Sequence, residues 1–266
     1  MKIRRIYAIV LILFLIVLIG CTDENYSENV VAVINGKTIT KEEIDKELTE
    51  RKMFVAIGEK IKSLEPNSPS PKEVLTQSFH ITEEELNTEQ IRYLESRERS
   101  TKLLDNNEAF NILLREEVFY QEALKQGHEV SIDKAKQILE ESNKISSETI
   151  KGDEEALKKQ KEITEYTNEI YKQYGFKSEE DYLKRRIERT AQAATISGMK
   201  NQFNKVITDK LSLTDNFQIN IEISNAWDDY GEFLLARAVV KILNPEYSVK
   251  LYGRPWSYGV LDLRRI

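Results

Sequence analysis

The chain of 266 residues has a single cysteine, Cys21, and only two histidines, His80 and His128. One thiol cannot form a disulfide within the chain, and it excludes a metal site built from several cysteines. Neither histidine follows a strand at the sharp turn that presents a catalytic residue, so a Ser-His-Asp arrangement is not expected. We therefore expect no catalytic residue, no metal and no other cofactor, and the sequence leans away from an enzyme.

Glycine and proline are also scarce, with 10 and 5 residues, and no glycine-rich phosphate loop is present. Charged residues make up 32% of the chain, which with so few helix breakers is a helical composition. Acidic side chains outnumber basic ones, 45 to 39. This balance argues against a nucleic-acid partner and against electrostatic binding to an anionic membrane surface.

The N-terminus has the layout of an export signal. Three basic residues among positions 2–5 precede an uncharged run over 6–20, which is short for a membrane-spanning helix of about 20 apolar residues. The end of that run, Leu18-Ile19-Gly20-Cys21, resembles the lipobox of bacterial lipoproteins. We expect residues 1–20 to be a cleaved signal peptide and Cys21 to carry fatty acid such as palmitate, with 21–29 as a tether. The protein would then be anchored by lipid on the extracytoplasmic face of the cell membrane. An uncleaved signal anchor is the alternative.

A strand, a tight turn and a capped helix follow one another from Val30. Residues 30–34 are a β-branched run typical of a buried strand, and Asn35-Gly36 favours a type I′ hairpin turn. After a brief return strand, Thr40 and Glu43 have the spacing of a capping box, which predicts a helix to about Ile57.

The next segment, about 58–106, interrupts this pattern. Three prolines among residues 66–71 predict an extended loop over 58–82. Thr82 and Glu85 then form a second capping-box pattern, which predicts the start of a charged helix.

Helices dominate the remainder. Apolar spacing predicts one from Glu108 that ends at Gly127, another from Ser131, and a third that ends at Gly175. Ser178 is predicted to cap a long helix that reaches about Leu211.

A shorter helix is expected over 225–238, followed by a strand at 239–243. This strand should pair with the strand at 30–34, because each would otherwise leave a bare edge. Residues 244–266 are expected to form a tail that makes a small hairpin or covers the sheet edge.

Three segments carry a resemblance to the SurA and PrsA group of extracytoplasmic foldases, specifically to the SurA N-terminal chaperone module. In VAVINGKTITKEEIDKEL the matching residues are Val31, Ala32, Val33, Asn35, Gly36, Ile39, Glu43 and Leu48. In the second segment they are Leu114, Glu117, Glu122, Ala123, Gly127, Val130 and Ser131, and in the third Gly175, Ser178, Glu179, Glu180, Tyr182 and Arg186.

The resemblance implies a mainly α module over residues 30–243, with an insertion at about 58–106. In it a small two- or three-stranded sheet would clasp the N- and C-terminal strands together. The parvulin domain that carries prolyl isomerase activity in that group has no counterpart in this sequence.

The expected function is therefore non-catalytic binding of unfolded or exported polypeptides. The candidate peptide-binding residues are Phe110, Leu114, Tyr182, Met199 and Phe203, although the same residues fit core packing. Two alternatives stay open: an active peptidyl-prolyl cis-trans isomerase, and an envelope or spore lipoprotein that binds one specific partner. The oligomeric state is not predicted.

Overall fold

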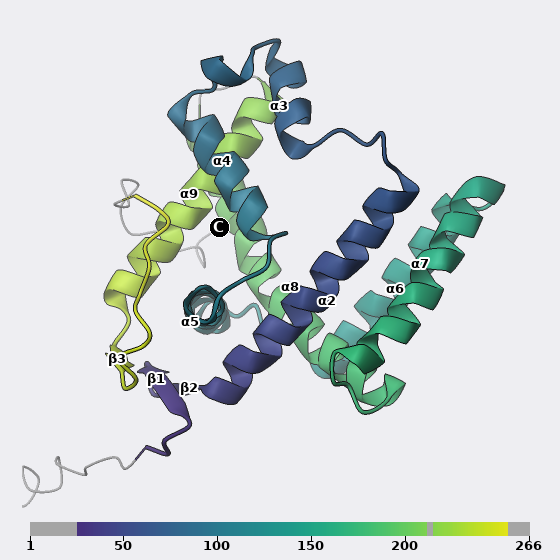
Figure 1. Ribbon diagram of the computed structural model, residues 1–266. Helices are drawn as coiled ribbons and strands as arrows, with labels where there is room; N and C mark the ends of the chain where they lie inside the picture. Colours follow the sequence, from purple (N-terminus) through teal and green to yellow (C-terminus); the bar gives the residue numbers. More distant parts are fainter. Residues whose placement is uncertain (1–25, 212–214, 255–266) are drawn as a thin grey trace, which may run out of the picture.

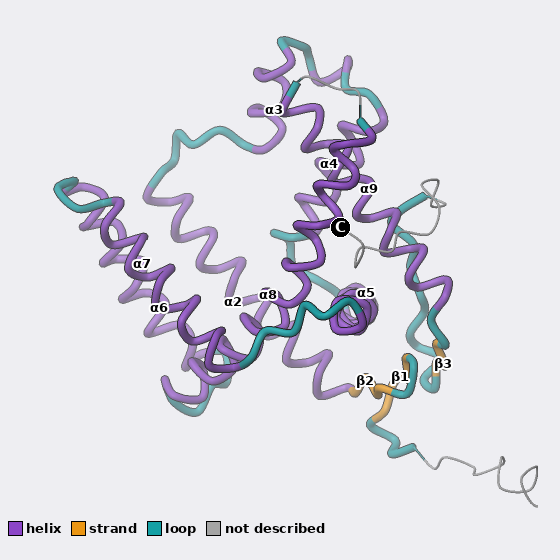
Figure 2. The backbone as a smooth tube through the Cα atoms, turned by 180° about the vertical axis from the view of Figure 1, so that it is seen from behind, coloured by secondary structure: helices purple, strands orange, loops and turns teal. Residues whose placement is uncertain are grey.

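The computed structural model describes residues 26–211 and 215–254 (Figure 1). The predicted signal peptide, the lipidation site Cys21 and the end of the tail lie outside these residues. Within them the fold is mainly helical, as predicted, with one small sheet at one end of the molecule (Figure 2). The elements are β1 Val30–Ile34, β2 Lys37–Thr40, α2 Lys41–Leu64, α3 Pro71–Phe79, the 3-10 helix η1 Glu83–Glu85, α4 Thr88–Arg99, α5 Asn106–Lys125, α6 Ile132–Thr149, α7 Glu154–Gln173, α8 Glu179–Lys210, α9 Asn216–Arg237 and β3 Val240–Ile242.

The sheet joins the two ends of the described chain, as predicted. Its strand order is β2-β1-β3, with both pairs antiparallel, and Val33 lies opposite Lys241. The turn residue Asn35 reinforces the junction, because its backbone N–H donates to the Val239 carbonyl at 2.9 Å and its side-chain oxygen accepts from the Val239 N–H at 2.8 Å. Asn35 and Gly36 have φ values of 49° and 87°, the left-handed conformation that an Asn-Gly turn supplies at low cost.

Most of the predicted helix ends are confirmed. The Glu43 carboxylate accepts from the Thr40 N–H at 2.8 Å while the Glu43 N–H donates to the Thr40 hydroxyl at 3.2 Å, a complete capping box. Ser131 and Ser178 cap α6 and α8 through their side chains. Gly127, with φ of 83°, closes α5 in a left-handed turn.

The segment 58–106 differs from its prediction. Helix α2 continues through Gly58 to Leu64, and the expected loop over 58–82 contains α3. A lone glycine costs a helix only about 1 kcal/mol, which packing overrides. Pro71 is the first residue of α3, where proline needs no N–H partner, and Ser70 caps it. Thr82 begins only the 3-10 turn η1, whereas the charged helix α4 begins at Thr88 after its cap Asn87.

Helix α9 begins at Asn216, well before the predicted residue 225. Its first turns are held in place by the 58–106 segment, because the Phe217 ring packs edge-on against Phe79 and Tyr93. The predicted hairpin or sheet-edge cover is not seen in the described part of the tail. After Asn244 the tail instead runs along α5 and α9 (Figure 1).

The core lies where the sheet meets α5, α8 and α9. Its aromatic centre is Phe119, Phe203, Trp227 and Tyr230, in which Phe119 stacks on Trp227 with ring centroids 4.4 Å apart. A second, smaller cluster around Met53 fastens α2 to α7 through Ile170 and Tyr171. The α6–α7 hairpin therefore projects to one side of α2 and the α4–α9 pair lies on the other (Figure 1).

Candidate functional site

An open cleft of about 790 Å³ lies between α2, α4, α5, α8 and α9. Each of these helices contributes side chains to its lining, and α6 adds Leu139. The apolar part of the lining includes Met53, Phe54, Phe119, Phe176, Ile196 and Trp227.

Part of this apolar lining is open to solvent. The Phe54 side chain lines the cleft and is 57% exposed, whereas Met53 beside it is fully buried in the smaller cluster. Phe119 and Trp227 stack and continue directly into the main core. The cleft thus combines one exposed aromatic side chain with the edge of the main core, a lining that suits contact with an apolar ligand.

The charged part of the lining is predominantly basic. Seven basic side chains, Arg51, Arg99, Arg115, Arg185, Arg186, Arg189 and Lys200, face three carboxylates, Glu50, Glu116 and Asp228. The chain as a whole carries a net charge of −6, so the cleft has the opposite sign to the protein around it. A positively lined cleft in an acidic protein attracts negatively charged ligands.

Arg189 of α8 forms ion pairs with two other helices at one wall of the cleft. Its guanidinium contacts Glu116 of α5 at 2.6 Å, and Glu47 and Glu50 of α2 at 3.1 and 3.6 Å. Glu47 is only 3% exposed, and this burial raises its pKa although Arg189 opposes the shift. Burial acts to lower the pKa of Arg189, but the carboxylates of Glu116 and Glu47 outweigh it and raise that pKa.

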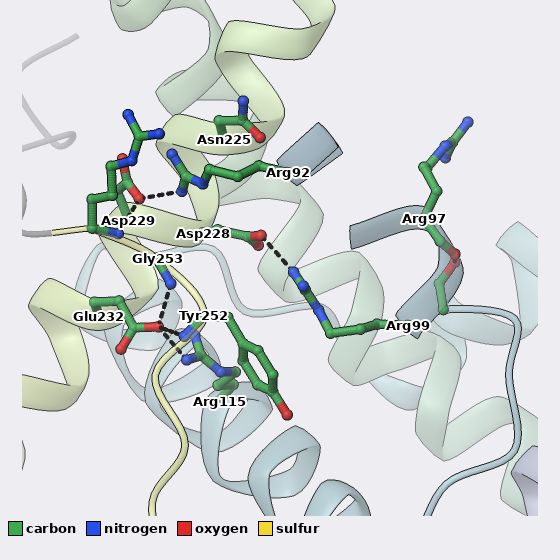
Figure 3. A network of polar contacts seen from close by, with 12 residues as sticks. Arg92, Arg97, Arg99, Arg115, Asn225, Asp228, Asp229, Glu232, Tyr252 and Gly253 are labelled. Atoms are coloured by element: carbon green, nitrogen blue, oxygen red, sulfur yellow. Dashed lines mark hydrogen bonds and ion pairs between the residues drawn. The ribbon is translucent and has the colours of Figure 1, made fainter. Parts of the chain in front are cut away.

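The opposite wall is a second network, shown in Figure 3. Arg92 and Arg99 of α4 pair with Asp229 and Asp228 of α9 at 2.6 and 2.8 Å. Burial raises the pKa of Asp228, and the Arg99 charge opposes that shift. The segment 58–106 thus contributes to one side of the cleft through α4, which is held on α9 by these ion pairs.

The tail is bonded to the same network, although none of its described residues lines the cleft. The Glu232 carboxylate pairs with Arg115 and accepts from the backbone N–H groups of Tyr252 at 2.7 Å and Gly253 at 2.9 Å (Figure 3). The Tyr252 ring lies between two guanidiniums, 4.6 Å from that of Arg99 and 4.5 Å from that of Arg115. Such contacts are cation–π interactions of about 0.5–1 kcal/mol each at partly exposed sites.

Two asparagines of α5 hold the tail backbone further along. The Asn111 amide donates to the Ser248 carbonyl at 2.8 Å and accepts from the Lys250 N–H at 2.7 Å, and Asn107 accepts from the Ser248 N–H at 2.8 Å. Asn107 and Asn111 are four residues apart on the helix, a rise of about 6 Å, which is close to the length of about 6.6 Å that two residues span in an extended chain. The two side chains therefore reach backbone groups of Ser248 and Lys250, which are two residues apart in the tail. The chain thus already contains one extended segment held through its backbone.

The residues predicted to bind peptide do not gather in the cleft. Phe110, Leu114, Met199 and Phe203 are fully buried in the main core, so their side chains offer no surface to a ligand. Tyr182 alone lines the cleft, half-buried and stacked on Tyr171 with ring centroids 5.5 Å apart. The sequence did not single out Phe54, Trp227 or the arginines of α8 as residues that line a common cleft. The cluster Lys184-Arg185-Arg186 was visible in the sequence, but its orientation was not.

The described lining contains no histidine or cysteine. Its three carboxylates, Glu50, Glu116 and Asp228, all form ion pairs with arginine. Among the described residues no group of three or more His, Cys, Asp or Glu is placed to hold a metal ion. What the lining offers a ligand is therefore apolar surface and positive charge.

The chain matches no protein-family model, no curated protein and no solved structure. In the part of the chain that the structure describes, no helix is both long and apolar enough to cross a membrane.

Proposed function

We propose that this protein is a lipid-anchored extracytoplasmic chaperone that binds unfolded or exported polypeptides without catalysis. The observation that carries the proposal is the open cleft, in which the exposed Phe54 side chain shares an apolar lining with the core residues Phe119 and Trp227. Its volume of about 790 Å³ lies within the range of about 300–1,000 Å³ that is usual for ligand sites. The likeness of three sequence segments to the SurA and PrsA chaperone module supports the same function.

Binding through the apolar part of such a cleft should be weak and tolerant of apolar sequence. Apolar contacts discriminate little between ligands, since one methylene changes a free energy of binding by only about 1 kcal/mol. The cleft is open, so a bound segment can enter and leave without threading. Both properties suit transient holding of many clients.

The anchor adds a geometric constraint to the proposal. With lipid on Cys21, the tether of residues 21–29 spans at most about 30 Å when fully extended, at about 3.3–3.6 Å per residue. The fold would then stay close to the membrane surface, where exported chains emerge.

An aggregation assay tests the proposal directly. The full chain, reconstituted in lipid nanodiscs, is expected to delay the light scattering of a chemically denatured client diluted into buffer, relative to empty nanodiscs. Phe54→Ser should weaken this effect several-fold because it removes exposed apolar surface from the cleft. The matched control is Ile145→Ser, at an equally exposed position (63%) that does not line the cleft. Equal loss in both variants, or no delay by the native chain, would contradict the proposal.

A refolding assay separates the proposal from prolyl isomerase activity. We expect no acceleration of a client whose refolding is limited by a proline bond. Acceleration that is abolished by His80→Ala or His128→Ala would identify an isomerase instead.

A further inference from the structure

Two cations of the cleft lack a carboxylate partner among the described residues. Arg99, Arg185 and Arg189 each pair with an acid of the chain, whereas no ion pair is formed by Arg186 or Lys200. Both line the cleft, and both belong to α8.

Each of these cations lies over an aromatic ring. The Lys200 ammonium is 5.2 Å from the Trp227 ring and the Arg186 guanidinium is 5.7 Å from the Tyr182 ring. Lys200 is half-buried, and burial lowers its pKa. The carboxylate of Asp228, whose charge acts to raise that pKa, is already bound to Arg99, and the charge of Arg97 lowers it further. A carboxylate from a ligand would therefore relieve an unfavourable environment at Lys200.

The sequence separation of Arg186 and Lys200 sets the distance between the two positive charges along α8. Fourteen helical residues rise about 21 Å and turn to within about 40° of the same face, so both side chains point into one side of the cleft. Between them α8 lines the cleft with Ala193 and Ile196 and with the polar residues Arg189, Thr190, Gln192 and Ser197, and Phe54 of α2 adds an exposed ring to the same lining. Arg189 is already paired with acids of the chain, so the two unpaired cations flank a middle that offers a ligand mainly apolar contacts.

An extended polypeptide covers about 21 Å in roughly six residues, at about 3.3 Å per residue. We infer that the cleft selects extended polypeptide segments in which two carboxylates, about six residues apart, flank apolar side chains. The inference deepens the proposed function and rests on it, since it names the class of segment that the same cleft prefers.

Peptide binding tests the inference. The ligand is a seven-residue peptide, blocked at both ends and labelled with fluorescein, that has glutamate at its first and seventh positions and leucine, phenylalanine, valine, tyrosine and leucine at the five positions between them. The neutral control peptide has the same sequence with glutamine at both of these positions. Fluorescence anisotropy with the full chain in nanodiscs should show the glutamine peptide bound at least tenfold more weakly. Added salt should reduce this difference, because ions screen charge pairs at a partly exposed site.

Variants assign the preference to the two cations. Arg186→Gln combined with Lys200→Gln should lower the affinity for the acidic peptide to that for the neutral peptide, and leave the neutral peptide bound as before. Lys200→Arg should keep the preference, since it keeps the charge. The control is Lys205→Gln, an exposed position of α8 outside the cleft, which should change neither affinity. A peptide with its glutamates three residues apart should bind more weakly than one with the six-residue spacing.

The possible failures are distinguishable. Equal affinity for the acidic and neutral peptides would overturn the inference and leave the proposed function standing. An acidic preference that survives the double substitution would also overturn it. If neither peptide binds and clients aggregate unhindered, the proposed function fails together with the inference.

Discussion

Replacing Arg189 by methionine should markedly lower the free energy of unfolding of the protein. Arg189 holds Glu116 of α5 and both Glu47 and Glu50 of α2, and the two acids of α2 are only 3% and 7% exposed. Methionine retains the apolar stem of the side chain and removes the charge. The variant leaves buried carboxylates with fewer partners and loosens the contact between three helices.

The expected loss in the free energy of unfolding follows from the burial of the carboxylates that Arg189 contacts. Removing one partner of a buried ion pair costs about 3–5 kcal/mol, because the other charge stays buried without compensation. The Arg189 side chain is 27% exposed, so water screens part of the interaction and the lower end, about 3 kcal/mol, applies. For a domain of this size that corresponds to a melting temperature lower by roughly 6–12 °C.

The cost should also depend on pH in a defined direction. Burial raises the pKa of Glu47 above its ordinary value of 4.5, and loss of the Arg189 charge raises it further. A glutamate whose folded-state pKa is raised destabilises the fold when ionised, and this penalty disappears as pH falls through the raised pKa toward 4.5. The difference in unfolding free energy between the native chain and Arg189→Met should therefore be largest at pH 7 and smallest near pH 4.5.

Urea denaturation followed by circular dichroism at these two pH values measures both effects. Arg186→Met is the matched control, since Arg186 is exposed and has no carboxylate partner in the described part of the chain; it should cost less than about 0.5 kcal/mol. Adding Glu47→Gln to the Arg189 variant should recover part of the loss. Equal destabilisation by the two arginine variants, or a cost that grows on acidification, would refute the reasoning.

Four further predictions concern other parts of the chain. Val33→Asp should cost several kcal/mol, because Val33 is 7% exposed in the central strand β1, and an unchanged melting temperature would contradict the role of the sheet. Gly253→Ala should detach the tail and expose it to limited proteolysis, since a Cβ there would lie 2.7 Å from the Asp228 carbonyl oxygen; Gly58→Ala meets no atom within 4 Å and should instead stabilise α2 by about 0.5–1 kcal/mol. Cys21→Ser should abolish metabolic labelling with fatty acid, and labelling that persists would disprove the lipid anchor.

The parts of the fold that depend on local chemistry could be predicted from the sequence. The Asn35-Gly36 turn, the Thr40 cap and the left-handed Gly127 each result from a backbone requirement that only a few residue types meet. The pairing of β1 with β3 could also be predicted, because each of these two β-branched runs would otherwise leave a bare edge.

The errors arose where packing outweighed local signals. Residues 216–223 alternate apolar and polar side chains, a pattern of strands, yet they form the start of α9 because Ile221 is fully buried there and Phe217 packs on Phe79. The cleft was missed for a related reason. Helical periodicity shows that Met199 and Phe203 lie on an apolar face, but which apolar faces remain uncovered depends on the positions of the other helices.

The pairing of β1 with β3 has a consequence for the order of events during folding. The two strands are separated by roughly 200 residues, and a contact over so long a loop forms late and slowly. Trp227 and Lys200 also come from the last third of the chain, so the cleft lacks two of its walls until that part has been made. A partly synthesised chain would expose β1 without an edge partner and would itself be prone to aggregate. The cleft therefore exists only after β3 has paired with β1 and the last helices have packed. Until then the chain needs the same protection from aggregation that we propose it gives to other chains.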